Sequence, residues 1–153
     1  MTPFPTRSES GEDAIRRSIA GIEEAMLRKD AAGVTAHYAP GTVIYNLAPP
    51  LIAEESEDPA PLQTWLDGWR GPVRRTTRDI RIYTDDTLGF AWSLVNISTR
   101  DGKSGDPVSF WFRETLCFLN GPGGWKIVHE HSSVPFYMDG SERAAIDLTP
   151  END

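Results

Sequence analysis

Two carboxylates on neighbouring predicted strands, Glu114 and Glu130, have the residue type and spacing for acid–base chemistry. Side chains alternate along a strand, so Glu114 shares one face with Phe112 and Leu116. A carboxyl group held among such apolar side chains would have a raised pKa and could act as a general acid or base. The alternative is a pair of solvated or interfacial glutamates that form ion pairs with nearby basic side chains, Arg113, Arg78 or Lys126.

Two histidines, His129 and His131, flank Glu130 on the same predicted strand. By alternation they share a face with Trp125 and Ile127. His131 is a candidate for acid–base work, with a carboxylate to hold its tautomer. It could instead satisfy backbone groups where its strand ends, or pack at a subunit interface. Two histidines at i and i+2 could begin a metal site, but no motif marks a third ligand, so we predict no metal and no cofactor.

A second set of residues has the character of a ligand site. Tyr45 and Asn46 end a short predicted strand and could orient a ligand by hydrogen bonds. Trp65 and Trp69 lie one turn apart on a predicted helix and could cover a flat hydrophobic ligand. Together with Glu114 they form the predicted ligand-binding set. The structural alternatives are an Asn that satisfies loop backbone and tryptophans that fill the core.

The order of predicted elements, helices first and strands afterwards, indicates an α+β fold. Isoleucines at helical spacing predict a helix over 12–29, and Asp30 is placed to cap a short second helix over 30–38. A strand over 42–47 and a Trp-rich third helix follow. Four β-rich runs then alternate with turn residues that suit hairpins: 74–84, 88–99, 108–119 and 125–133. We expect the helices to pack on a strongly curved antiparallel sheet that forms a cone with an internal pocket.

The chain has 153 residues, which is enough for one domain with a sizeable core. We expect a flexible N-terminus over 1–10, a single domain over 11–138 and a C-terminal tail over 139–153. The lone Cys117 cannot form an intrachain disulfide, which favours a cytoplasmic location.

The formal net charge is −8, so the chain has no excess of positive charge to attract nucleic acid. Anionic membranes would repel a chain with this net charge. No apolar run approaches the roughly 20 residues that span a bilayer. We therefore expect a small-molecule ligand, and neither a nucleic-acid nor a membrane partner.

Several motifs resemble one known family, the SnoaL-like branch of the nuclear-transport-factor superfamily, which has a cystatin-like cone fold. The resemblance covers about residues 12–136. It rests on YNLAPP at 45–50, the Trp-rich helix that ends in Gly71-Pro72, RET at 113–115 and WKIVHEH at 125–131. The C-terminal hairpin is also similar to the association domain of calcium/calmodulin-dependent kinase, in which a Glu-Thr strand and a Trp, His-x-His strand close the same sheet.

The resemblance implies a fold more firmly than an activity, because this superfamily includes isomerases, cyclases, dehydratases, hydrolases and non-catalytic assembly domains. Ketosteroid isomerase, a member of this fold, uses a Tyr and a protonated Asp as oxyanion donors and a second Asp as base. The order of elements places these three groups near Ile22, Leu116 and Tyr45 or Asn46, respectively. None of the required side chains is present, so we predict that the chain is not an isomerase of that mechanism.

Three functions remain open at this point. The first is a homodimeric pocket protein that binds a small, mostly apolar organic molecule. The second is a lyase, isomerase or cyclase that uses Glu114, Glu130 or His131 as acid or base. The third is a non-catalytic dimerisation module. Dimerisation is expected because one sheet face would otherwise expose a large patch of mainly apolar and aromatic side chains. The residues of this face are Trp92, Leu94, Trp111, Arg113, Thr115 and Cys117.

Overall fold

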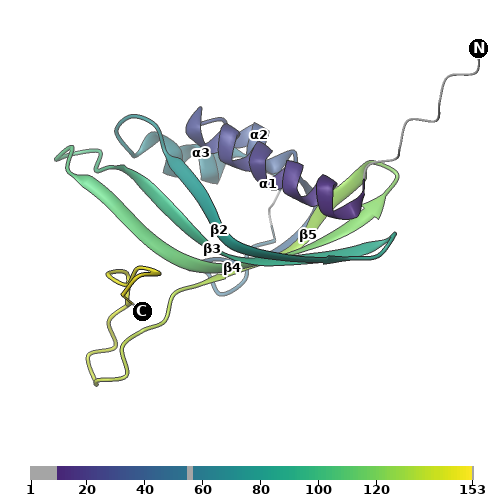
Figure 1. Cartoon of the computed structure of the whole chain (residues 1–153). Coiled ribbons are helices and arrows are strands. Elements are labelled where there is room, and N and C mark those ends of the chain that lie inside the picture. Colours follow the sequence, from purple (N-terminus) through teal and green to yellow (C-terminus); the bar gives the residue numbers. More distant parts are fainter. Residues whose placement is uncertain (1–9, 55–56, 153) are drawn as a thin grey trace, which may run out of the picture.

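The computed structural model describes residues 10–54 and 57–152. Apart from Ser10, the segment 1–10 that we expected to be flexible lies outside the described residues. The elements, in chain order, are α1 (Gly11–Leu27), α2 (Ala31–Thr35), β1 (Tyr38–Tyr45), α3 (Ala60–Asp67), β2 (Arg74–Thr84), β3 (Leu88–Arg100), β4 (Pro107–Gly121) and β5 (Gly124–Ser133). The predicted α+β class is confirmed, with the helices on the concave side of a curved sheet (Figure 1).

Local sequence explains where the helices begin. The Ser10 hydroxyl accepts a hydrogen bond from the Asp13 backbone N–H at 3.1 Å, which satisfies one of the unpaired donors at the start of α1. The Asp30 carboxylate does the same for α2 through the Gly33 N–H at 3.0 Å. The second helix ends at Thr35, earlier than predicted, and the next strand already begins at Tyr38.

The strand order is β1-β5-β4-β3-β2, and β1 pairs parallel with β5. The strands β2 to β5 form the expected antiparallel sheet, and the parallel pairing of β1 with β5 corrects this expectation at one edge, so the sheet is mixed. The physical reason is that β1 precedes the meander of β2 to β5 and joins it at the free edge of the last strand. Pro40 and Gly41 lie within this edge strand, where a missing backbone donor is tolerated.

A β-bulge in β5 changes which side chains face the helices. Phe118 pairs with Ile127 and Cys117 with His129, so Val128 is an extra residue without a partner on β4. Ile127 is fully buried, whereas His131 is exposed. The prediction that both histidines share a face with Ile127 is therefore wrong, because the bulge reverses the alternation.

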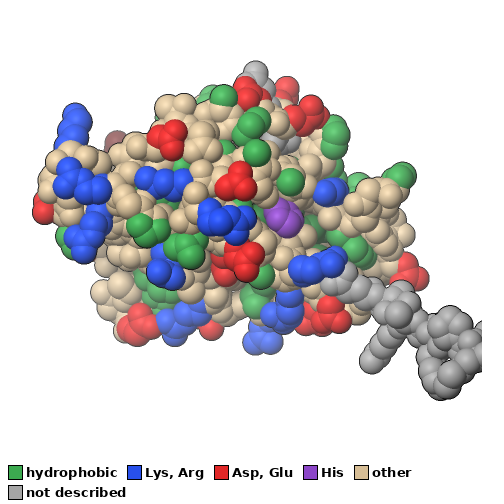
Figure 2. Space-filling view, turned by 90° about the horizontal axis from the view of Figure 1, so that it is seen from above, with side chains coloured by type: hydrophobic (Ala, Val, Ile, Leu, Met, Phe, Trp, Pro, Cys, Tyr) green, Lys and Arg blue, Asp and Glu red, His purple; other side chains and the backbone are tan. Residues whose placement is uncertain are grey.

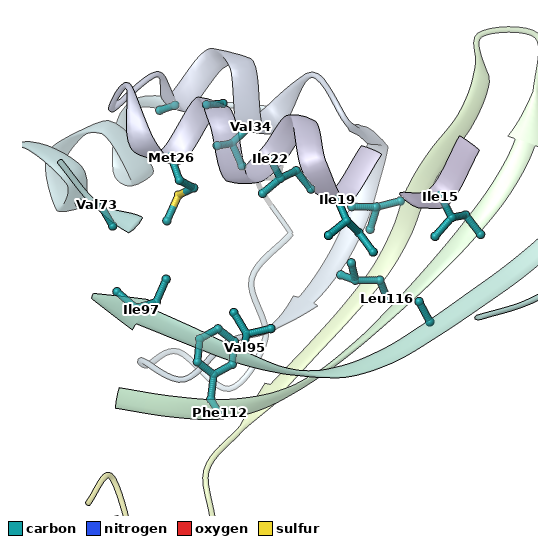
Figure 3. Close-up of a cluster of buried hydrophobic side chains, with 14 of the residues drawn as sticks. Ile15, Ile19, Ile22, Met26, Val34, Val73, Val95, Ile97, Phe112 and Leu116 are labelled. Atoms are coloured by element: carbon teal, nitrogen blue, oxygen red, sulfur yellow. The ribbon is translucent and has the colours of Figure 1, made fainter. Parts of the chain in front are cut away.

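The core lies between α1 and the concave face of the sheet. Ile15, Ile19 and Ile22 are buried on one face of α1, as their spacing predicts. Figure 3 shows these side chains and those of the neighbouring helices above side chains that rise from β3 and β4. The opposite surface of the helices carries acidic and basic side chains interspersed with apolar ones (Figure 2).

The segment after β5 extends beyond the convex side of the sheet (Figure 1). It turns back on itself, with the Ala145 N–H donating to the Pro135 carbonyl at 2.8 Å. Arg78 of β2 forms an ion pair with Glu151, which ties the end of this segment to the sheet. None of the helices in the described residues is long and apolar enough to cross a membrane.

Candidate functional site

A cavity of about 1010 Å³ lies between the helices and the concave face of the sheet. Its walls come from all three helices, from the segment after β1 and from the strands. Most of the wall is apolar, including Ile22, Met26, Leu62, Ile97, Phe110 and Phe112. A cavity of this size and character suits a small organic molecule, for which a few polar groups would set the orientation.

One polar group in the cavity is the ion pair of Arg75 and Glu114. The two Nη atoms of Arg75 donate to the two carboxylate oxygens at 2.5 and 3.2 Å. The side chains are only 8% and 3% exposed, and they come from β2 and β4, which flank β3. Burial alone would lower the pKa of the guanidinium, but the charge and hydrogen bonds of Glu114 raise it overall. Arg75 is therefore a fixed cation that is already paired.

The second polar group is formed by Glu130 and two hydroxyls. The Tyr38 hydroxyl donates to Oε2 of Glu130 through a short hydrogen bond, and the Ser132 hydroxyl donates to Oε1 at 3.3 Å. Burial, followed by the negative charge of Glu114, raises the pKa of Glu130 to about 7, although Tyr38 and Arg75 act in the opposite direction. Burial and the charge of Glu130 in turn raise the pKa of Tyr38 well above 10. A carboxyl group with a pKa near neutrality can both give and take a proton at physiological pH.

The structure brings together four of the predicted site residues. Glu114, Glu130, Asn46 and Trp65 all line the cavity. The Asn46 side-chain oxygen also accepts from the Leu47 backbone N–H at 2.7 Å, so this residue both orders the loop and faces the cavity.

Three other predicted residues, Tyr45, Trp69 and His131, do not line the cavity. Tyr45 packs edge-on against His129 and His131 on the convex face, with ring centroids 4.9 and 5.4 Å apart. The expectation that Tyr45 marks the polar end of the pocket is corrected, because the parallel register with β5 sets it opposite His131. Trp69 packs partly buried against the core, and its ring lies 5.7 Å from that of Trp65.

The two histidines have different surroundings from those that we predicted. His131 is exposed on the face opposite to Glu130, so it does not meet the cavity. It is His129 whose ring Nδ1 lies 2.8 Å from a backbone oxygen, that of Val43 on β1. The structural role that we assigned to His131, which was to satisfy backbone at the strand end, therefore fits His129.

Sequence reasoning missed Tyr38, Arg75 and Ser132 as members of the site. Arg75 lies two residues after the buried Val73, and this alternation was the one available signal that its side chain points inward. Tyr38 was hidden by its assignment to the second helix. Of the three positions inferred from ketosteroid isomerase, Ile22 and Asn46 line the cavity, and Leu116 is buried in the core. Within the described residues, no group of three or more potential metal ligands occurs.

Comparisons with known proteins confirm the resemblance inferred from the motifs. A family model described as a SnoaL-like domain matches residues 15–137. An NTF2-like protein of unknown function from Pseudomonas putida KT2440 is 25% identical, with a TM-score of 0.79 over 91% of this chain and 96% of that chain. No curated protein matches the chain.

Two more distant structures share the fold. A protein from Novosphingobium aromaticivorans, provisionally named a scytalone dehydratase, is 15% identical with a TM-score of 0.71 over 86% of this chain and 88% of that one. The association domain of CaMKII from C. elegans is 17% identical, with a TM-score of 0.62 over 80% and 94% of the respective chains.

We predict that Arg75→Met destabilises the protein by about 3–5 kcal/mol, because it leaves the Glu114 carboxylate buried without its cation. The double variant Arg75→Met/Glu114→Leu should regain most of this loss, since no unpaired charge remains. Urea denaturation measures both effects. Arg78→Met removes an exposed ion pair on the same strand and is the matched control. A loss in the Arg75 variant no larger than in this control would contradict the prediction.

Glu130 should make stability depend on pH. The folded state raises its pKa from an ordinary 4.5 to about 7, so below pH 4.5 the group is protonated in both states. As the pH rises from 4.5 to 7, the unfolded chain loses this proton first, and the contribution of Glu130 to stability declines. Relative to the native protein, Glu130→Gln should therefore gain stability across this range and remain level above it. Urea denaturation between pH 4.5 and 8 tests this, and a constant difference would contradict it.

Proposed function

We propose that this chain, which belongs to the SnoaL-like domain family, uses its cavity to bind a small, mostly apolar organic molecule that carries one polar group. The apolar body of the ligand would contact the walls formed by the helices and by Phe110 and Phe112. Its polar group would meet Tyr38 and Glu130. A cavity of about 1010 Å³ supports this proposal over a module whose only role is dimerisation, for which a filled interior would suffice.

The observation that carries the proposal is the presence of two polar groups, the buried pair Arg75–Glu114 and the partly buried Glu130, at the wall of an apolar cavity. Burial of an ion pair and partial burial of a further carboxyl group cost desolvation energy, and apolar side chains of similar volume would often be more stable. Arg75, Glu114 and Glu130 are held at this cost in contact with an open space, rather than inside a packed core. Such an arrangement is expected where polar groups serve a ligand.

We predict that 1-adamantanemethanol, an apolar probe with one hydroxyl, changes the tryptophan fluorescence through Trp65, and that Trp65→Phe removes this change. Tyr38→Phe should weaken binding by about 1 kcal/mol, or about fivefold, because it removes one neutral hydrogen-bonding group. Tyr45→Phe makes the same chemical change on the convex face and should leave the affinity unaltered. Weaker binding in the Tyr45 variant alone would place the ligand outside the cavity.

A second candidate function is acid–base catalysis at Glu130, of the lyase, isomerase or cyclase type. The pKa of about 7 and the adjacent Tyr38 hydroxyl favour this residue. Glu114 is bound to Arg75, and His131 lies outside the cavity, so they are weaker candidates for the base. The structure from Novosphingobium aromaticivorans that is provisionally named a scytalone dehydratase has the same fold, and by analogy it supports a lyase-type reaction. For a turned-over substrate, Glu130→Gln would keep binding and lose turnover. Robust steroid double-bond isomerisation is not expected.

We also propose that the convex face of the sheet forms a homodimer interface. Tyr83, Phe90 and Trp92 stack on this face with centroids 5.4 to 5.9 Å apart, although each is 38–54% exposed. Thr115 and Cys117 lie opposite Trp92 and Phe90 on β4 and continue this surface. An exposed aromatic cluster of this kind is typical of a protein contact.

Sedimentation should show a dimer at micromolar concentration, and Trp92→Glu should convert it to a monomer by placing a charge in the interface. Leu51→Glu, at an exposed residue far from this cluster in the sequence, is the matched control and should remain dimeric. An unaltered protein that sediments only as a monomer would contradict the proposal.

A further inference from the structure

On the basis of the proposed function, we infer that the polar group of the ligand is a cationic nitrogen, which the Glu130 carboxylate binds. The ligand class is then an apolar amine, protonated at neutral pH. The inference rests on the charges around the cavity and on which of them already have partners.

The described residues that line the cavity include four carboxylates but only one guanidinium. The carboxylates are Glu54, Asp58, Glu114 and Glu130, and the cation is Arg75. Both Nη atoms of Arg75 are bound to Glu114. Within the described part of the chain, Glu130 forms no ion pair, so its negative charge has no cation of its own.

The hydrogen bonds of Glu130 fit an ionised carboxylate. Both of its neighbouring hydroxyls, Tyr38 and Ser132, donate to it, one to each oxygen. Glu130 is partly buried, and a carboxylate withdrawn from water without a cation is costly and is relieved either by a proton or by an incoming positive charge. A ligand ammonium supplies that charge and adds charge-assisted hydrogen bonds, which are stronger than neutral ones.

The rest of the site favours the same charge. Glu54 and Asp58 are exposed carboxylates on the loop side of the cavity, where they would attract a cation towards it. An anionic ligand would meet carboxylates both there and at the wall. The main rival is a neutral ligand with an oxygen acceptor, because the buried Nε–H of Arg75 has no hydrogen-bond partner among the described residues and could donate to that oxygen.

Three probes with the same apolar body separate these possibilities: 1-adamantanemethylamine, 1-adamantanemethanol and 1-adamantanecarboxylate, titrated calorimetrically at pH 7.5. We expect the amine to bind about tenfold more tightly than the alcohol, a factor that corresponds to about 1.4 kcal/mol. The carboxylate should bind most weakly. Glu130→Gln, which keeps the shape and removes the charge, should abolish the preference for the amine over the alcohol.

A second readout needs no variant. The titratable groups that face Glu130 are Tyr38 on β1, Arg75 on β2 and Glu114 on β4. At pH 6.5 part of the Glu130 population is protonated, so binding of the amine should release protons, whereas the alcohol should release none. Calorimetry in two buffers with different ionisation enthalpies measures this release.

The outcomes are distinct. If the alcohol or the carboxylate binds as tightly as the amine, or if the amine releases no protons, the inference is overturned while the proposed pocket function remains. If none of the three probes binds at millimolar concentration, the proposed function itself fails, and the inference fails with it.

Discussion

The ion pair between Arg75 and Glu114 engages the one cationic side chain that lines the cavity among the described residues. It spans β3 and neutralises the one guanidinium in the cavity wall among the described residues. This cation is paired with Glu114, and among the described residues Glu130 has only hydroxyl partners. Burial, followed by the negative charge of Glu114, raises the pKa of Glu130 to about 7, although the charge of Arg75 acts in the opposite direction. The negative charge of Glu130, on which the proposed preference for a cationic ligand rests, thus lacks a cation because Arg75 is already paired with Glu114.

A single extra residue determines which chemistry faces the cavity. With regular alternation after the buried Ile127, His129 and His131 would point inward and Glu130 outward. The bulge at Val128 reverses this order, so the cavity receives a carboxylate and the convex face receives the imidazoles. The same reversal brings Tyr45 against the histidines through the parallel register of β1. The bulge therefore decides that Glu130, and not the two histidines, faces the cavity.

These two features also show what the sequence could and could not predict. Helical spacing, turn residues and the order of elements identified α1 and the four long strands, because each pattern is local. The order of elements, helices first and strands afterwards, also predicted helices packed on a curved sheet. A bulge leaves no such local signal, so the faces of β5 were assigned wrongly beyond Ile127. The partner of Glu114 was also missed, because Arg75 and Glu114 are 39 residues apart and meet only when β2 and β4 flank β3.

The core and the cavity adjoin each other under the helices and share some side chains. Ile15, Phe118 and Ile127 are fully buried and do not line the cavity. Ile22 and Met26, further along α1 than Ile15 (Figure 3), belong to the core and also line the cavity. Packed side chains at the start of α1 can hold the helix on the sheet even though its later turns have an open space below them. The packed part offsets the cost of the cavity and of the charges at its wall. Residues such as Ile15, Phe118 and Ile127 hold the fold together without meeting the cavity, which gives a physical reason why one cone-shaped fold can serve different ligands.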